Sequence, residues 1–279
     1  MSEGQDPLYD REAAAFLQRR EAGRAAGDDE KFALLLGELA DCRRLVDIGC
    51  GWGQFLGKVA AARPDVTELW GVDESPDRAA DVAAACPAAR TVICRADRLD
   101  LPDAHFDVAV TSQMLHEVKL FGRPGQMAET LAEIRRVLAP GGRWLLLDHQ
   151  DAGDGEAVVS MPAALTARLA EFESRFRFYD ASHEQLPDGS IRISRRCLQD
   201  FLTKAWSLGS PMERMEMNET HNVFRRAETV GLLASAGFTV TRWLDFADIR
   251  EDLARAGAEL LSGTRWPRKF LVTATKEHR

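Results

Sequence analysis

The feature that most constrains the fold is a short glycine-rich loop between an apolar segment and a helix-forming segment. The loop spans residues 49–53, reads GCGWG and follows the apolar segment 44–48. Glycines at alternate positions let the backbone turn sharply and approach a ligand closely, because no Cβ intrudes. A helix over 54–62 would begin there with unpaired N–H groups and a partial positive charge. Strand, glycine turn and helix together predict an α/β fold with a ligand site at the turn.

Strand-like and helix-like segments alternate through the first half of the chain. We expect strands at 44–48, 68–72, 90–94, 106–111 and 143–148, and helices at 54–62, 76–85 and from Met127 to Leu138. The proline and glycines at 140–142 end the last of these helices. The pattern resumes with a helix at 227–235 and strands at 238–244 and 269–275. This alternation predicts a mostly parallel sheet with helices on both faces.

The alternation is interrupted by an insertion from about residue 151 to 222. Apolar residues recur every three or four positions from Met161 to Tyr179 and predict a long amphipathic helix. Asp188-Gly189 indicates a hairpin, and Ser194 is a candidate N-cap for a further helix. The expected organisation is an N-terminal lid helix (1–28), a core (29–150), the insertion (151–224) and the completion of the core sheet (225–279).

Acidic residues follow the second and third predicted strands. Asp73 lies about 20 positions beyond the glycine loop, where an acid can accept both hydroxyls of an adenosine ribose. Asp97 follows the third strand and could accept a hydrogen bond from an adenine amino group. The dinucleotide fingerprint GxGxxG would require a glycine where this chain has Gln54, so a nicotinamide dehydrogenase is disfavoured. A phosphate-binding GxxxxGK[ST] run is absent from the sequence as well.

With these motifs the chain resembles the class I S-adenosylmethionine (SAM)-dependent methyltransferases over residues 29–150 and 225–276. The matching motifs are Asp47-x-Gly49-x-Gly51-x-Gly53, Asp73, Asp97, Phe106-Asp107-Val108, Ser112-Gln113 and Leu138-x-Pro140-Gly141-Gly142. The resemblance implies a Rossmann-like, seven-stranded, mostly parallel sheet whose seventh strand is antiparallel, with a lid insertion after the fifth strand. It implies SAM as the cofactor and methyl transfer to a small-molecule, biosynthetic or secondary-metabolite acceptor.

The resemblance also implies which residues contact the cofactor. Asp47 would lie near the methionyl amino group, Asp73 at the ribose, Asp97 at the adenine, and Ser112-Gln113 near the methionyl group. The full expected set is Asp47, Gly49, Gly51, Gly53, Asp73, Glu74, Asp97, Arg98, Ser112 and Gln113. The insertion and the N-terminal helix would form a lid over the carboxyl edge of the sheet, where the methyl group must lie.

Three residues are candidates for catalysis. His116 follows the fourth strand and is placed to act as a general base, although packing is the alternative role for it. Glu219 and His221 lie in the insertion, in a run that mixes flexible apolar and polar side chains as small-molecule pockets do. With Glu213 and Glu216 they fit no metal-ligand signature, and a solvated helix face explains them equally well. No metal is therefore expected.

Composition narrows the classes of partner. A net charge of −8 and a pI of about 5.4 leave no electrostatic footprint for nucleic acid. The five cysteines are odd in number and lack CxxC spacing, which favours reduced thiols. No signal peptide or membrane-length apolar run is present, so a soluble cytoplasmic protein is expected. An RNA or protein methyltransferase and a SAM-binding scaffold or sensor remain alternatives, as does a homodimer formed through the insertion.

Overall fold

The computed structural model describes residues 15–16 and 29–277, and the chain divides into two compact units. The core unit comprises Glu30–His149, Phe224–Phe246 and residues 269–277. The insertion unit comprises Gln150–Val223 and Ala247–Arg268. Each unit has its own cluster of buried apolar side chains. Within the described part of the chain, no helix is long and apolar enough to span a bilayer.

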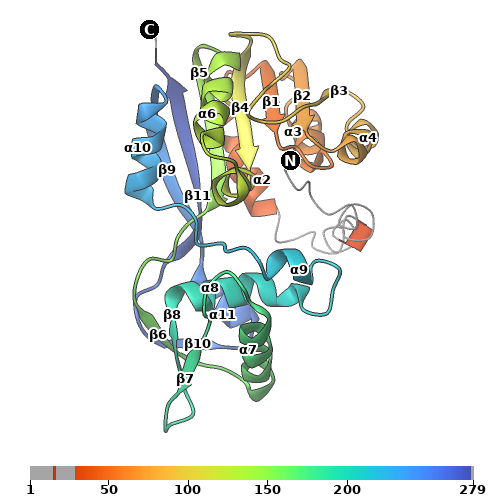
Figure 1. Cartoon of the computed structure of the whole chain (residues 1–279). Helices are drawn as coiled ribbons and strands as arrows, with labels where there is room; N and C mark the ends of the chain where they lie inside the picture. Colours follow the sequence, from red (N-terminus) through yellow and green to blue (C-terminus); the bar gives the residue numbers. More distant parts are fainter. Residues whose placement is uncertain (1–14, 17–28, 278–279) are drawn as a thin grey trace. The chain divides into compact units, whose positions relative to one another are not determined.

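The core unit is built on a seven-stranded sheet with the strand order β3-β2-β1-β4-β5-β11-β9 (Figure 1). Its strands are β1 (Arg44–Ile48), β2 (Glu68–Asp73), β3 (Ala89–Ile93), β4 (Phe106–Ser112), β5 (Leu138–His149), β9 (Phe238–Asp248) and β11 (Pro267–Lys276). β1 pairs in parallel with β2 and β4, β2 with β3, and β4 with β5. β11 runs antiparallel to β5. The Rossmann-like, mostly parallel sheet predicted from the sequence is confirmed.

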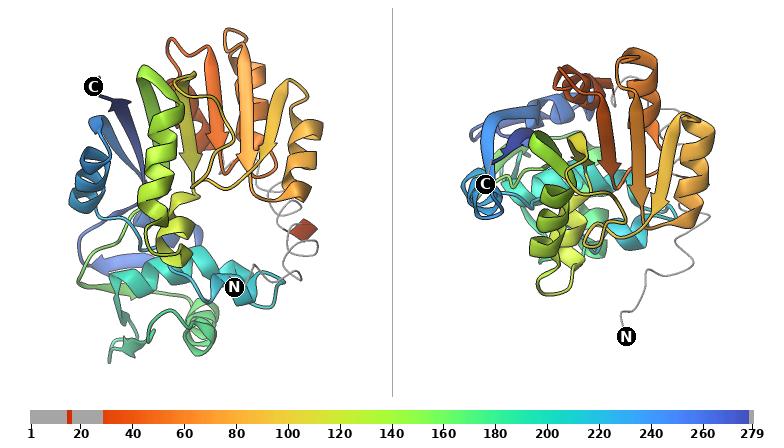
Figure 2. Two further views of the ribbon diagram at one scale, coloured as in Figure 1. Left: turned by 45° about the horizontal axis from the view of Figure 1, so that its top comes forward. Right: turned by 90° about the horizontal axis from the view of Figure 1, so that it is seen from above.

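Helices cover both faces of this sheet, with α3 and α6 on opposite faces (Figure 2). The core helices are α2 (Asp29–Gly37), α3 (Gln54–Ala62), α4 (Pro76–Ala85), α5 (Leu115–Phe121), α6 (Gln126–Val137) and α10 (Arg226–Ser235). Because both faces are covered, the central strands are almost continuously apolar. Leu45, Val46 and Ile48 of β1 are all fully buried. Gly237 has a φ of +78° directly after the C-cap of α10, as its predicted role after that helix requires.

Two details of the core unit differ from the sequence prediction. β5 begins at Leu138, immediately after α6, so the predicted turn at residues 140–142 lies inside the strand. The β4–β5 ladder shifts register there: Phe106 pairs with Leu138, whereas Val108 pairs with Arg143. The turn is therefore a bulge within a paired strand. The short helix α5, which carries His116, has too few residues for its apolar spacing to stand out in the sequence.

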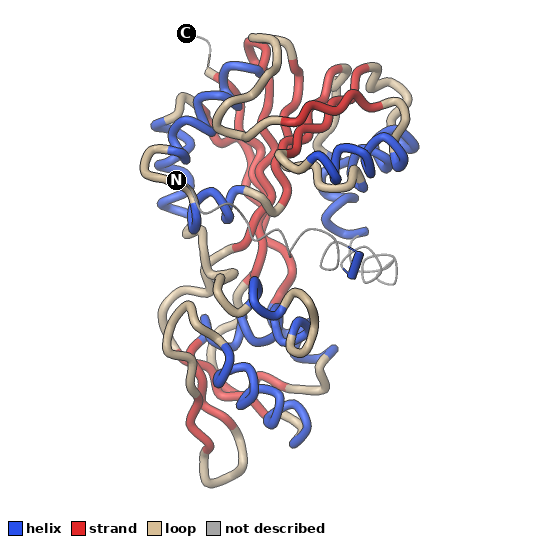
Figure 3. Tube along the Cα trace, turned by 45° about the vertical axis from the view of Figure 1, so that its right-hand side comes forward, coloured by secondary structure: helices blue, strands red, loops and turns tan. Residues whose placement is uncertain are grey.

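The insertion unit contains a four-stranded sheet with the order β10-β6-β8-β7. Its strands are β6 (Glu156–Ser160), β7 (His183–Gln185), β8 (Ile191–Ser194) and β10 (Glu259–Ser262) (Figure 3). Its helices are α7 (Ala163–Arg175), α8 (Arg195–Lys204), α9 (Glu213–Glu216) and α11 (Ile249–Arg255). A 3₁₀ turn, η2 (Ala205–Ser207), follows α8. The predicted hairpin is confirmed as β7–β8. Ser194 caps α8 as predicted, accepting a hydrogen bond from the Cys197 N–H.

Two expectations about the insertion are corrected. α7 ends at Arg175, so Phe176 and Tyr179 lie beyond it. Residues 247–268 were expected in the core but fall in the insertion unit, because the segment between β9 and β11 contains α11 and β10, and β10 pairs with β6 of the insertion. The insertion unit has a buried apolar core of its own. The predicted N-terminal lid helix lies outside the described residues, apart from residues 15–16.

The buried core of the insertion unit leads to a prediction about the stability of a Phe172 variant. Phe172 is fully buried and packs its ring near those of Phe176 and Phe201. Phe172→Ala should lower the free energy of unfolding by about 3–5 kcal/mol, because it removes a large apolar side chain and leaves a cavity. Phe178→Ala is the matched control, since that side chain is 42% exposed. Chemical denaturation would measure both variants, and equal losses would contradict the packing described here.

Candidate functional site

The carboxyl edge of the core sheet gathers the ends of four parallel strands. Asp47 and Ile48 of β1 pair with Gly71 and Val72 of β2, so the glycine loop lies beside the end of β2. On the other side Ser112 at the end of β4 pairs with Leu147, just before Asp148 and His149. Ligands of open α/β sheets bind at this edge. The core-unit residues predicted to bind the cofactor are thus brought to the edge where such a ligand lies.

Hydrogen bonds tie the glycine loop to β2. The N–H groups of Gly49 and Cys50 both donate to the Val72 carbonyl, at 2.8 and 3.0 Å. The Gly51 N–H donates to Asp73 Oδ2 at 3.0 Å. Gly53 then begins α3 without any side-chain cap, so the first turn of the helix presents N–H groups that no capping side chain uses. The loop is therefore held in one shape by the end of β2.

Two glycines of the loop are required for different reasons. A Cβ on Gly49 would lie 2.5 Å from Met114 Cγ, so this position is closed by packing. A Cβ on Gly51 would meet no protein atom within 4 Å. Both residues have positive φ, +76° and +53°, which disfavours any side chain. The space beside Gly51 is where a bound molecule could approach the backbone.

Asp73 has a structural role in addition to the predicted binding role. Its side chain is 3% exposed, and its Oδ1 accepts the Ser75 N–H at 3.0 Å while its Oδ2 accepts the Gly51 N–H. The Arg78 guanidinium is 3.6 Å from Oδ2 and also lies over the Trp52 ring. A carboxylate oxygen has two lone pairs, so each oxygen of Asp73 retains acceptor capacity after these N–H contacts.

Asp47 is buried, and its Oδ1 has no hydrogen-bond partner among the described residues. Burial raises the pKa of this carboxyl to about 7, with a further contribution from the nearby charge of Asp73 and a smaller opposing one from Lys31. Burying such an acceptor without a partner is costly unless a ligand supplies the donor. Asp47 is therefore suited to receive a cationic N–H donor.

The remaining predicted cofactor residues follow β2 and β3. The pKa of Asp97 is lowered, chiefly by its hydrogen bonds to Arg95, with Nε 3.0 Å from Oδ1. Arg123 donates to Oδ2 at 3.3 Å. Glu74 is 3.9 Å from the Arg95 guanidinium, and the Arg98 N–H donates to the Arg95 carbonyl. Arg95 and Arg123 are thus the residues that fix Asp97, a role the sequence did not indicate.

A second cluster lies at the ends of β4 and β5. His116, in the first turn of α5, is buried, and its Nδ1 is 2.8 Å from Asp148 Oδ1. Asp148 is fully buried and also accepts the backbone N–H groups of His116 and His149, at 3.1 and 2.7 Å. The His116 and His149 rings meet edge to face with centroids 4.9 Å apart. Sequence reasoning found His116 but missed Asp148 and His149.

Gln113 belongs to the same cluster. Its φ is +54°, an uncommon conformation for a residue other than glycine. Lys269 Nζ donates to its Oε1 at 3.2 Å, which orients the amide so that Nε2 faces His149 Nε2 at 3.1 Å. Backbone strain of this kind is stored where the surroundings hold it, often at functional sites. The side chain of Gln113 thus contacts His149 in addition to its predicted place near the cofactor.

Glu219 and His221 lie in the insertion unit. Glu219 is buried, and its Oε1 is 2.7 Å from the fully buried Lys204 Nζ. Glu216 contacts the same ammonium at 2.9 Å. His221 Nδ1 is 2.9 Å from Thr203 Oγ1. The interpretation of this run as a solvated helix face is therefore wrong, because Glu216 and Glu219 form a buried ion cluster with Lys204.

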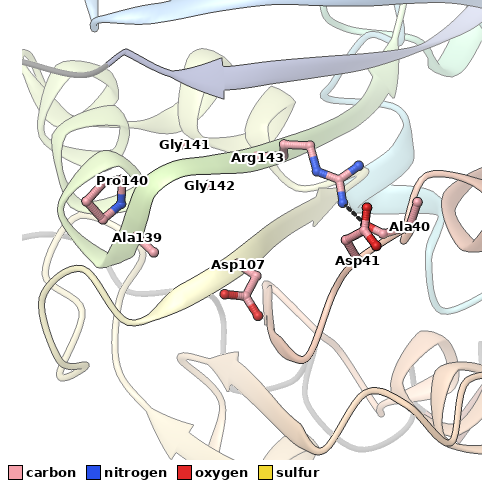
Figure 4. A pocket seen from close by; sticks show the side chains of 8 residues that line it. All are labelled: Ala40, Asp41, Asp107, Ala139, Pro140, Gly141, Gly142 and Arg143. Carbon is pink, nitrogen blue, oxygen red and sulfur yellow. Dashed lines mark hydrogen bonds between the residues drawn. The ribbon is translucent and has the colours of Figure 1, made fainter.

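A pocket of the core unit lies at the opposite edge of the sheet, by Asp107 and Arg143 (Figure 4). Its polar side chains are used within the fold. Asp107 accepts the backbone N–H groups of Arg43 and Arg44, and Arg143 donates to the carbonyls of Glu38 and Ala40. This pocket is lined by the segment after α2 and by residues of β4 and β5, and it is not the candidate site.

Comparison with known families agrees with the geometry of the carboxyl edge. Residues 46–146 match the family described as methyltransferase domain. This range begins in β1 and ends in β5, so it contains the glycine loop, Asp73, Asp97 and His116. Residues 46–146 of the core unit are therefore similar to a methyltransferase domain.

Curated relatives match only part of this chain. An uncharacterized methyltransferase of Synechocystis sp. is 30% identical over 125 residues, 44% of this chain and 56% of that protein. A ubiquinone/menaquinone biosynthesis C-methyltransferase of Paraburkholderia phytofirmans is 30% identical over 118 residues, 40% of this chain and 45% of that protein. The chain thus spans about half the length of the curated relatives it matches.

Solved structures share the fold over most of the chain. A SAM-dependent methyltransferase of Mesorhizobium loti has a TM-score of 0.53 at 20% identity, covering 88% of this chain and 96% of that one. The 1,6-didemethyltoxoflavin-N1-methyltransferase of Burkholderia thailandensis, solved with that compound and S-adenosylhomocysteine (SAH), has a TM-score of 0.51 at 18% identity and covers 100% and 94%. At this identity the likeness concerns the fold alone.

The closed packing at Gly49 gives a testable prediction for the core unit. Gly49→Ala and Gly209→Ala place a Cβ at the same φ of +76°, but nothing lies within 4 Å of the Cβ at Gly209. Both variants should be less stable than the wild type by about 1–2 kcal/mol, because a Cβ is strained in the left-handed backbone conformation. Gly49→Ala should lose roughly 1–3 kcal/mol more, because Met114 must move. Denaturant titration of the two variants measures these losses. If Gly49→Ala loses no more free energy of unfolding than Gly209→Ala, the prediction is contradicted.

Proposed function

We propose that this protein is a SAM-dependent methyltransferase acting on a small-molecule acceptor. The observation that carries the proposal is the buried Asp47 carboxyl, whose Oδ1 has no partner among the described residues at the edge of the methyltransferase domain. A methionyl ammonium would supply the missing donor. The open space beside Gly51 and the uncapped start of α3 suit the rest of an amino-acid ligand.

The adenosine end of the cofactor fits the two other acids. Both oxygens of Asp73 retain a lone pair for the ribose hydroxyls. Asp97 Oδ1 accepts one arginine N–H and Oδ2 accepts two, so Oδ1 retains capacity for an adenine amino group. Glu74, Arg98, Ser112 and Gln113 complete the proposed set together with the three loop glycines.

Bound SAM supplies a methyl group on a positively charged sulfur, a good leaving group. The protein's part is to hold the acceptor in line and to exclude water, and good alignment contributes about 7–11 kcal/mol. His116 is the proposed base for an acceptor that must lose a proton, which adds roughly 10²–10⁴-fold. Among the predicted catalytic residues, His116 is the one that belongs to the methyltransferase domain.

The names of two similar proteins favour a small-molecule acceptor. One is a C-methyltransferase of ubiquinone/menaquinone biosynthesis, and the other methylates a nitrogen of 1,6-didemethyltoxoflavin. The insertion unit is the proposed acceptor-binding part, with Glu219 and His221 its candidate contributors. Three further points stay predictions from the sequence: that the insertion forms a lid, that nucleic acid is not a partner, and that the protein could form a homodimer.

SAH binding tests the proposal through the loop glycines. Isothermal titration calorimetry should show at least micromolar affinity for the wild type. Gly51→Ala should weaken binding more than tenfold, because its Cβ enters the space assigned to the ligand. Gly209→Ala, also at positive φ with nothing near its Cβ, should bind SAH like the wild type. No SAH binding by the wild type would refute the proposal.

The raised pKa of Asp47 predicts opposite effects on binding and stability. Because the unfolded carboxyl titrates near 3.8 and the folded one near 7, the native state holds an extra proton between these values. Stability should therefore fall with rising pH there, by up to about 1.4 kcal/mol per pH unit relative to Asp47→Asn. SAH affinity of the wild type should instead rise from pH 6 to 8 as the carboxylate forms. Asp47→Asn should bind weakly with no such rise, and a parallel rise in both proteins would exclude Asp47 as the ammonium ligand.

A further inference from the structure

Three arginines lie close together in the chain where β8 passes into α8, and two of them pair with acids. Arg192 Nη1 is 2.5 Å from Glu184 Oε2, and Arg196 Nε is 2.8 Å from Asp151 Oδ1. Arg195 is the third, and its guanidinium forms no ion pair or hydrogen bond with any residue that the structure describes. Its positive charge is therefore not neutralised by the described part of the fold.

Two acids close to Arg195 are used by the other two arginines. The Arg195 N–H donates to the Gly155 carbonyl at 3.0 Å, and a Cβ on Gly155 would lie 3.5 Å from Arg195 Cδ, so the side chain passes directly over this glycine. Asp154 and Glu156 flank the glycine in the chain. Each forms its ion pair with one of the neighbouring arginines, at 3.0 and 3.8 Å. The local acids thus leave Arg195 to another anion.

A buried tryptophan holds the Arg195 side chain in place. The guanidinium carbon lies 4.6 Å from the centre of the Trp266 ring, where the ring attracts a cation. Trp266 is 3% exposed, and its Nε1–H donates to Gln199 Oε1 at 2.9 Å, which fixes the indole. A side chain that is already held loses little entropy when it binds a ligand. Arg195 is therefore preorganised.

One donor of Arg195 is buried without an acceptor. Its Nε has no hydrogen-bond partner among the described residues, and burying such a donor is costly. The side chain as a whole is only half-buried, so a ligand can reach the guanidinium. Arg195 is also the first residue of α8, where a further positive charge is unfavourable and an anion is favourable. The charge, the fixed plane and the unused donor together indicate an oxyanion as the missing partner.

We propose that Arg195 binds an oxyanion group, a carboxylate or a phosphate, on the small-molecule acceptor. This rests on the proposed methyltransferase function, in which the insertion unit is the acceptor-binding part. A planar guanidinium presents paired N–H groups whose spacing matches two oxygens of such a group, which the point charge of a lysine does not do. Arg195 is a binding residue that selects anionic acceptors and takes no part in the chemical step.

Nitrogen-15 NMR of the full-length protein tests the anion site directly. The protein is labelled on arginine, and Arg195→Lys assigns the Nε–H signal of Arg195, whose burial slows the exchange of that proton. Benzoate, phenyl phosphate and the neutral benzamide are titrated with and without SAH. We expect a saturable shift of this signal with benzoate or phenyl phosphate and none with benzamide, and the tighter anion shows which oxyanion is preferred. A response to benzamide equal to that of the anions, or no response to either anion, would overturn the inference.

Variants separate a specific site from general attraction by surface charge. Arg195→Gln should weaken binding of the preferred anion by about tenfold or more, because a charged hydrogen-bond donor is lost. Arg195→Lys keeps the charge without the planar pair of N–H groups and should bind with intermediate affinity. Arg192→Gln is the matched control, since it removes the same charge from a 41% exposed side chain that already pairs with Glu184, and it should bind like the wild type. Thermal denaturation shows that the variants are folded. Equal weakening in Arg195→Gln and Arg192→Gln would overturn the site.

Turnover with SAM tests the acceptor class. Hydroxybenzoates and hydroxyphenyl phosphates are compared with the matching hydroxybenzamides, with SAH release as the readout. We expect turnover of anionic members, with KM raised about tenfold or more in Arg195→Gln while kcat and SAH affinity stay unchanged. Turnover confined to the amides, or no turnover of any anion, would overturn the acceptor assignment. A wild type that binds benzoate at Arg195 but not SAH would instead defeat the proposed function and leave the anion site standing.

Discussion

The shape of the site depends on the junction between the glycine loop and β2. Two N–H groups converge on the Val72 carbonyl, and a third bonds Asp73, so the loop cannot move without breaking backbone pairing at the end of the strand. This junction brings the buried carboxyls of Asp47 and Asp73 close enough to repel one another, which contributes to the raised pKa of Asp47. The fold therefore stores an unfavourable arrangement that a cationic ligand would relieve.

The sequence predicted the core unit well because its signals are local. Each strand there is a short apolar run followed by a turn, and each helix has an apolar face, so the pattern alone placed Asp73 at the end of β2 and Asp97 after β3. The insertion unit was harder. β6 and β10 are separated by about a hundred residues, and their pairing depends on contacts that no local pattern records. That pairing is why residues 247–268 were assigned to the wrong unit.

The same distinction applies to the site. His116 was found because it follows a predicted strand, whereas Asp148 was read only as the end of β5. A signal did exist: Asp148 and His149 are polar residues that directly follow the apolar run 144–147 at the edge where ligands bind. Their mutual contacts were beyond the sequence, because the hydrogen bond from His116 to Asp148 joins residues 32 positions apart. The contact of Gln113 with His149 likewise depends on Lys269, which lies in β11.

Burial changes how the candidate residues of the insertion unit must be tested. Lys204 is fully buried, and its pKa stays raised despite desolvation because Glu216, Glu219 and Asp200 surround it. Removing one partner of a buried ion pair typically costs about 3–5 kcal/mol, because the other charge is left uncompensated. A loss of activity in a Glu219 variant would therefore follow from unfolding as readily as from chemistry. His221 is tied to the same cluster, since its backbone N–H donates to Asp200 at 2.7 Å. A catalytic role for either residue is thus established only when stability and SAH affinity are measured on the same variant and turnover falls further than both.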